Sequence, residues 1–209
     1  MEQQNETSTR DKIMRAAARM FSEKGFERVT TREIAKAIGI NSATIYYYFP
    51  SKDELLKSLY EFYTTERRKE YPDIDELLRL AETDPPHEVL MKTEFHYNED
   101  IMEYLDQILV TAVRRIVVDP ESEGFIRENI FDSIRNILQP LLTRLVELGK
   151  IEPFDINVFL NILSYYCFAA AALNNSSYGQ SVAQYQAAMS CIYSMIVPIE
   201  GKDSQGIVG

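Results

Sequence analysis

Three consecutive tyrosines, Tyr46 to Tyr48, follow the small residues Ser42, Ala43 and Thr44 in one short segment. Neighbouring side chains on a helix point about 100° apart, so the three rings cannot all enter one small core. A tyrosine that stays outside can donate to a phosphate oxygen and lay its ring along a sugar or a thymine methyl group. Small residues at the start of such a helix would let it enter a major groove closely.

The elements that hold these residues begin with two predicted helices. From Thr9, apolar residues recur at the spacing of an amphipathic helix, which Gly25 ends. Thr30 and Glu33 have the spacing of a capping box, and this box opens a second, short helix over 31–38.

A tight turn joins this short helix to the one with the tyrosines. Gly39 supplies the reversal, and Asn41 is a favourable N-cap for a helix over 42–49. Pro50 ends that helix, because a proline disfavours helical geometry at the residue before it. Two short helices joined by such a turn predict a helix-turn-helix motif at about 31–50.

Helical periodicity continues to the end of the chain. A capping box of Ser51 and Glu54 starts a long helix that reaches about Lys69. Further helices are expected at 74–80, 89–95, 101–116, 126–148, 155–173 and 181–197. Pro140 should kink or break the helix that contains it. Since no segment alternates with the period of a strand, we predict an all-α chain of about nine helices.

Charge is divided unevenly along the sequence. The net charge of −10 would by itself predict repulsion from nucleic acid and anionic membranes. Residues 1–70 carry a net of +2, however, and residues 71–209 a net of −12. Charge acts over about 8 to 10 Å at working salt, so the first part can bind phosphate while the acidic part faces away.

Residues 9–57 resemble the DNA-binding domain of TetR-family transcriptional regulators. The shared features are Thr30-Thr31 before Arg32, Gly39 in the turn, and Thr44-Ile45-Tyr46 followed by Tyr48-Phe49-x-x-Lys52-x-x-Leu55-Leu56. The resemblance implies contacts with double-stranded DNA from Thr31, Arg32, Asn41, Ser42, Ala43, Thr44, Tyr46, Tyr47 and Lys52. Tyr48 can instead pack under the next helix, and Thr31 can be a cap only.

One departure from the family pattern concerns base readout. Family members often have a Lys or Arg followed by Gly where this chain has Ser42-Ala43. Readout should therefore depend less on a bidentate guanine contact and more on the tyrosines.

The rest of the chain matches the family only in being helical and in total length. We therefore expect tails at 1–8 and 200–209, a DNA-binding domain at 9–57, and an effector-binding and dimerisation domain at 58–199. Residues 155–173 are apolar nearly all round the helix, which predicts burial on two sides. With 181–197 they are expected to form the four-helix interface of a homodimer, whose two recognition helices would read a pseudo-palindromic operator.

An effector pocket is expected among the helices that follow the DNA-binding domain. The candidate lining residues are Phe62, Tyr63, Phe95, His96, Met102, Tyr104 and Tyr166. The acidic residues Glu94, Glu99, Asp100 and Glu103 nearby would favour a cationic ligand, although a solvated acidic face is the simpler interpretation.

Several classes of site and location find no support in the sequence. The two histidines, His87 and His96, have no cysteine at ligand spacing, so neither a metal nor another cofactor is expected. Without a nucleophile elbow, a glycine-rich phosphate loop or a Cys-x-x-Cys motif, we expect no enzyme. Cys167 and Cys191 form no disulfide framework, and we expect a cytoplasmic protein with no membrane-spanning segment.

Together these features predict a homodimeric repressor that a small-molecule effector releases from its operator. Three alternatives stay open: an activator, a DNA binder that needs no effector, and a helical small-molecule binder that has lost DNA binding.

Overall fold

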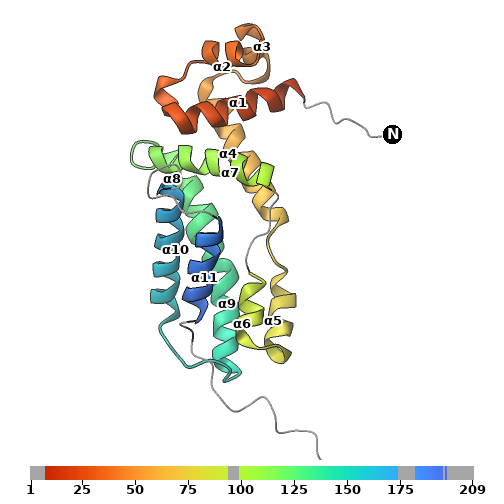
Figure 1. Cartoon of the computed structure of the whole chain (residues 1–209), viewed down its shortest axis with the longest axis vertical. Helices are drawn as coiled ribbons and strands as arrows, with labels where there is room; N and C mark the ends of the chain where they lie inside the picture. Colours follow the sequence, from red (N-terminus) through yellow and green to blue (C-terminus); the bar gives the residue numbers. More distant parts are fainter. Residues whose placement is uncertain (1–7, 94–98, 174–181, 195, 197–209) are drawn as a thin grey trace, which may run out of the picture. The chain divides into compact units, whose positions relative to one another are not determined.

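The computed structural model describes residues 8–93, 99–173, 182–194 and 196, and these ranges contain no β-strand (Figure 1). The predicted all-α fold is confirmed. The helical segments are α1 (Thr9–Lys24), η1 (Phe26–Arg28, a 3-10 turn), α2 (Thr31–Ala37), α3 (Ser42–Tyr48), α4 (Lys52–Lys69), α5 (Ile74–Thr83), α6 (Pro86–Met91), α7 (Glu99–Arg115), α8 (Pro120–Ile126), η2 (Arg127–Asp132, a π-helical turn), α9 (Ser133–Glu147), α10 (Ile156–Leu173) and α11 (Val182–Ser194).

The first of two compact units contains α1 to α4, α7 and α8. Within it, α1 lies between α2 and α3 on one side and α7 on the other (Figure 1). The apolar positions predicted for α1 are buried, with Ile13, Ala17 and Phe21 at 0% exposure. The expected boundary between residues 57 and 58 falls inside α4, which belongs wholly to this unit. The two compact units thus divide the chain at other positions than the functional domains 9–57 and 58–199. These two domains remain predictions.

The second unit contains α5, α6, η2 and α9 to α11. Its core includes Leu141 and Leu145 of α9 and Leu160 and Leu163 of α10. Pro140 lies inside α9 without ending it, so the predicted alternative of a break there is wrong. The packed apolar face of α9 offsets the one backbone hydrogen bond that a proline removes.

At 18 residues, α10 is long and apolar enough to cross a membrane by length and composition alone, which corrects the expectation that no segment would be.

Ser8 caps α1, because its Oγ accepts from the backbone N–H of Asp11 at 3.1 Å. The other residues of the predicted tails, 1–7 and 200–209, lie outside the described residues.

Candidate nucleic-acid interface

The helix that carries the tyrosines begins and ends as its sequence predicts. Gly39 has a φ of 71°, a conformation that suits a residue without a side chain, and it makes the tight turn after α2. Asn41 caps α3, since its Oδ1 accepts from the backbone N–H of Ala43 at 2.9 Å. Ile45 and Phe49 are buried, at 0% and 2% exposure, and anchor α3 on the domain.

All three tyrosines of α3 stay at least partly outside the core, whereas helical spacing required only that they not all enter it. The exposed fraction is 52% for Tyr46, 82% for Tyr47 and 37% for Tyr48. The rings of Tyr47 and Tyr48 pack edge to face, with centroids 5.1 Å apart. At about 100° per residue, Ala43 and Tyr47 lie across the helix from buried Ile45. Tyr47 is therefore the side chain of this helix that is most available to a partner.

Tyr46 differs from Tyr47 because its hydroxyl is engaged within the domain. The hydroxyl oxygens of Tyr46 and Thr31 lie 2.9 Å apart, and either group can be the donor. Thr31, the first residue of α2, is itself buried at 8% exposure. This bond ties the start of α2 to the middle of α3 and leaves the ring of Tyr46 half exposed.

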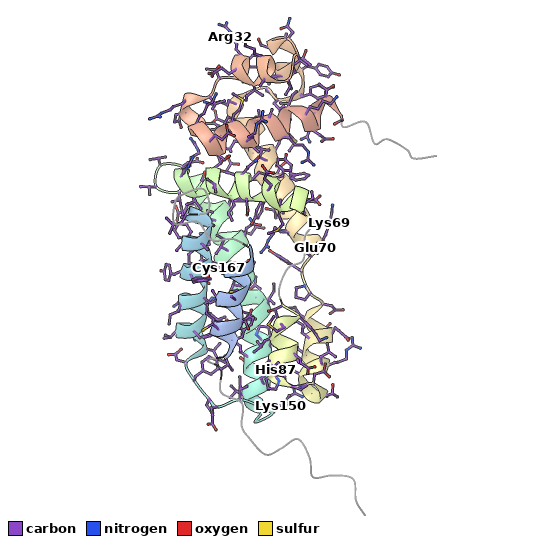
Figure 2. The ribbon with its side chains drawn as sticks, in the orientation of Figure 1. Arg32, Lys69, Glu70, His87, Lys150 and Cys167 are labelled. Atoms are coloured by element: carbon purple, nitrogen blue, oxygen red, sulfur yellow. The ribbon has the colours of Figure 1, made fainter. Side chains whose placement is uncertain are left out.

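The start of α2 has the predicted capping box. The backbone N–H of Thr30 donates to Glu33 Oε2 at 2.8 Å, and the N–H of Glu33 donates to Thr30 Oγ1 at 3.3 Å. Hydrogen bonds from the Thr30 backbone and side chain lower the pKa of Glu33 below its ordinary value. Arg32, labelled in Figure 2, is exposed beside this cap. The box thus fixes the start of α2, the helix that carries the exposed Arg32.

Lys52 binds the domain itself rather than projecting freely from α4. Its Nζ donates to the carbonyl oxygens of Phe26 at 3.0 Å and Val29 at 3.1 Å. The same Nζ lies 4.2 Å from the centroid of the Phe26 ring, and the guanidinium carbon of Arg115 lies 4.0 Å from it. An ammonium group has three donors, so the phosphate contact that the family resemblance implies would use the third.

The other predicted DNA contacts differ in exposure. Asn41 and Ala43 are exposed, whereas Ser42 and Thr44 are half-buried. The sequence pattern missed Arg10, whose guanidinium carbon lies 5.1 Å from the centroid of the Phe49 ring. No local signal could have identified this pair, because the two residues are far apart in the sequence and meet only in the folded domain.

The predicted effector residues fall into separate groups. In the first unit the rings of Phe62 and Tyr104 lie 4.9 Å apart, and the Arg15 guanidinium carbon is 4.7 Å from the Tyr104 ring centroid. Burial raises the pKa of Tyr104 well above its ordinary value. Tyr63 is buried against Phe125, with ring centroids 5.0 Å apart.

The remaining effector candidates do not join the aromatic residues Phe62, Tyr63 and Tyr104 in the described contacts. Met102 is half-buried in the first unit, and Tyr166 packs against the core of the second. Phe95 and His96 lie outside the described residues, as does Glu94. Glu103 is exposed and accepts from Gln107 Nε2 at 3.0 Å. The described part of the chain holds no group of three or more His, Cys, Asp or Glu side chains that could bind a metal ion.

Relatives match only part of the chain. The family model for bacterial regulatory proteins, tetR family, matches residues 13–59. The HTH-type transcriptional regulator YerO of Bacillus subtilis (strain 168) is 32% identical over 114 residues, which are 54% of this chain and 38% of YerO. IcaR of Staphylococcus aureus (strain Newman), the negative transcriptional regulator of the biofilm operon icaADBC, is 46% identical over 52 residues, 25% of this chain and 26% of IcaR. The chain thus spans well under half the length of these relatives.

Solved structures match over nearly the whole chain. A TetR-family regulator from Agrobacterium tumefaciens has a TM-score of 0.63 at 20% identity and covers 90% of this chain and 97% of its own. A transcriptional regulator from Saccharomonospora viridis, solved in complex with choline, has a TM-score of 0.59 at 18% identity over 91% of this chain and 98% of its own. At such identities the likeness establishes the fold. Residues 13–59 thus match the tetR family of bacterial regulatory proteins on the helix-turn-helix, and the chain shares the fold of the regulator from Agrobacterium tumefaciens.

Proposed function

We propose that this protein is a homodimeric transcriptional repressor that binds a pseudo-palindromic DNA operator and leaves it when a small molecule binds. The observation that supports this most directly is the outer face of α3, where Tyr47 is 82% exposed beside Tyr46. A large aromatic side chain costs free energy when it is left in water, so a ring this exposed is suited to a partner surface. The negative regulator IcaR, 46% identical over 52 residues, supports the repressor role.

Specific readout would be divided among these residues. Tyr47 and Ala43 face away from the core and are placed to meet base edges and thymine methyl groups. Arg32 is exposed at the start of α2 and can contact phosphate. Tyr46, whose hydroxyl is bonded to Thr31, would contribute its ring rather than its hydroxyl.

The homodimer is supported by the outer surface of α10. Val158, Ile162 and Tyr165 are 52%, 62% and 64% exposed, and their spacing places them on one side of the helix. At the edge of this side Arg135 donates to the Oδ1 atoms of Asn157 and Asn161, at 2.9 and 3.0 Å. A guanidinium is costly in hydrocarbon, so this surface suits a second protein helix better than a membrane.

Release by an effector would act through α4. This helix carries Lys52 at its start, bonded to the residues after α1, and Phe62 and Tyr63 further along. The regulator from Saccharomonospora viridis has choline bound in the same fold, which supports a small-molecule effector here. A ligand that prefers one position of α4 shifts the population of DNA-binding-competent dimers by its difference in affinity for the two states.

The deciding experiment is a binding measurement with DNA that the protein selects from a random-sequence library. We expect affinity for the recovered duplex to exceed that for a scrambled duplex by about 10³ or more at physiological salt. A ratio under about tenfold would favour the helical binder that has lost DNA binding. Reporter expression in cells with and without the protein then separates a repressor from an activator.

A further inference from the structure

Arg10 makes two side-chain contacts, one with Phe49 at the C-terminal end of α3 and one with Met14 on its own helix. Its guanidinium carbon lies 5.1 Å from the centroid of the Phe49 ring, and its Nη1 donates to Met14 Sδ at 3.2 Å. Phe49 follows the last residue of α3 and is only 2% exposed, so the ring under Arg10 is part of the rigid core. Arg10 itself is exposed.

Aromatic contacts connect this position to the tyrosines of α3. The Tyr48 ring lies 6.5 Å from that of Phe49, and Tyr47 lies 5.1 Å from Tyr48. In Figure 1, α3 lies above the N-terminal half of α1. A series of ring contacts therefore links Arg10 to Tyr47, although Arg10 comes from a different helix.

The charge of Arg10 is available to a partner. Among the side chains that the structure describes, no carboxylate lies within ion-pair distance of Arg10. The adjacent carboxylate of Asp11 is bound by Ser8, whose Oγ donates to Asp11 Oδ2 at 2.7 Å. A guanidinium has five N–H donors in a planar fork, a geometry that matches two oxygens of a phosphate.

We propose that Arg10 contacts a backbone phosphate of DNA and thereby positions α3 in the major groove from the side of α1. The inference rests on the proposed DNA-binding function. Phosphate contacts set the orientation of a protein on DNA without reading bases. The ring of Phe49 pre-orders the guanidinium, so less conformational freedom is lost when the phosphate binds. Arg10 is thus a positioning residue whose effect is the same for every DNA sequence.

The test measures affinity against salt concentration for the full chain. The probes are the duplex that the wild-type protein selects from a random library and a scrambled duplex of the same composition. For Arg10→Ala we expect both affinities to fall by a similar factor, and the slope of log affinity against log salt to decrease by about 0.9 for each Arg10 removed. Arg10→Lys keeps the charge and should keep most of the slope.

Arg19→Ala is the matched control. It removes the same charge from the same helix, and Arg19 is exposed two and a half turns further on, on the opposite face. We expect the wild-type slope for this variant. Equal slopes for Arg10→Ala and Arg19→Ala would overturn the proposal, because a general charge effect would then explain both. Thermal melting followed by circular dichroism checks that each variant is folded.

Failure of this inference can be distinguished from failure of the proposed function. If the wild-type protein does not prefer its selected duplex, DNA recognition fails and the role of Arg10 fails with it. If it does, and Tyr47→Ala loses the preference while Arg10→Ala behaves like Arg19→Ala, only the role of Arg10 is wrong.

Discussion

Thr31 and Tyr46 hold the two helices of the helix-turn-helix together through their hydroxyl groups, which lie 2.9 Å apart. Thr31 is buried at 8% exposure, whereas Tyr46 is 52% exposed. The family resemblance assigns both Thr31 and Tyr46 to DNA contact, yet in the structure their hydroxyl groups bond each other. The consequence is that Tyr46 is fixed from within the domain, whereas Tyr47 is 82% exposed.

Removing this hydroxyl pair should weaken DNA binding in a non-additive way. We expect Thr31→Val and Tyr46→Phe each to lower stability by about 1 kcal/mol, the usual net value of one hydrogen bond. Each should weaken binding to the selected duplex by a similar factor, and the double variant should lose little more. A double-mutant cycle on affinity and on urea unfolding measures this. Additive losses in affinity would mean that the Tyr46 hydroxyl serves DNA directly.

Tyr47 should determine specificity without supporting the fold. Because its side chain is 82% exposed, Tyr47→Ala should change the free energy of unfolding by less than about 0.5 kcal/mol. Affinity for the selected duplex should fall by about 1 to 3 kcal/mol, the range for one good base contact, and affinity for scrambled DNA much less. Fluorescence anisotropy with both duplexes checks the prediction, which unchanged specific affinity would contradict.

Lys52 should contribute to stability as well as to DNA binding. Lys52→Ala removes the donor to the carbonyls of Phe26 and Val29 and the cation over the Phe26 ring. We expect the free energy of unfolding to fall by about 2 kcal/mol, since hydrogen bonds from a charged group are worth about 1.5 to 3 kcal/mol. Lys57→Ala, at an exposed position on the same helix, is the control and should cost under about 0.5 kcal/mol. If Lys52→Ala and Lys57→Ala lowered the free energy of unfolding in urea equally, the contacts of Lys52 would not stabilise the domain.

The buried pair of Tyr60 and Ser122 should respond unequally to loss of either hydroxyl. Their oxygens lie 2.7 Å apart, and Ser122 Oγ also donates to Asp119. Tyr60→Phe leaves Ser122 with that acceptor and should cost about 1 kcal/mol. Ser122→Ala strands the Tyr60 hydroxyl, which is on a side chain only 4% exposed, and should cost more, up to about 3 kcal/mol. Thermal or urea unfolding of both variants shows which of the two substitutions lowers the free energy of unfolding more.

Alkaline pH offers a second check on the same pair. Burial is the main cause that raises the pKa of Tyr60 from 10.0 to about 12. The unfolded chain loses this proton first, so the contribution to stability is complete below pH 10 and is lost as pH rises towards 12. The Tyr60→Phe variant should not show this part of the loss of stability at alkaline pH. An identical pH profile for the variant would contradict the assignment.

The α10 surface should control the oligomeric state. Ile162→Glu places a charge where a partner helix would pack, and we expect the dimer to dissociate. Val117→Glu is the matched control, because Val117 is 92% exposed outside α10. Sedimentation velocity at about micromolar concentration distinguishes monomer from dimer. A dimer that persists in Ile162→Glu would exclude α10 as the interface.

Much of the helix-turn-helix could be predicted because its signals are local. The Thr30–Glu33 box and the Asn41 cap each depend on atoms within three residues, so their geometry follows once the helix forms. The exposure of the tyrosines on α3 follows from helical geometry alone. For the same reason the turn at Gly39, just after α2, follows from residue type.

The sequence by itself determined that the chain is all-α, where α2 and α3 begin, and that α3 presents tyrosines outward, but it missed α8 and placed α6 too late in the chain. Only the tertiary structure decided that Lys52 binds the carbonyls after α1, that Thr31 bonds Tyr46, and that Arg10 lies on Phe49. The physical reason is that caps and periodicity depend on neighbours along the chain. Side-chain partners between helices depend instead on packing angles, which the whole core sets together.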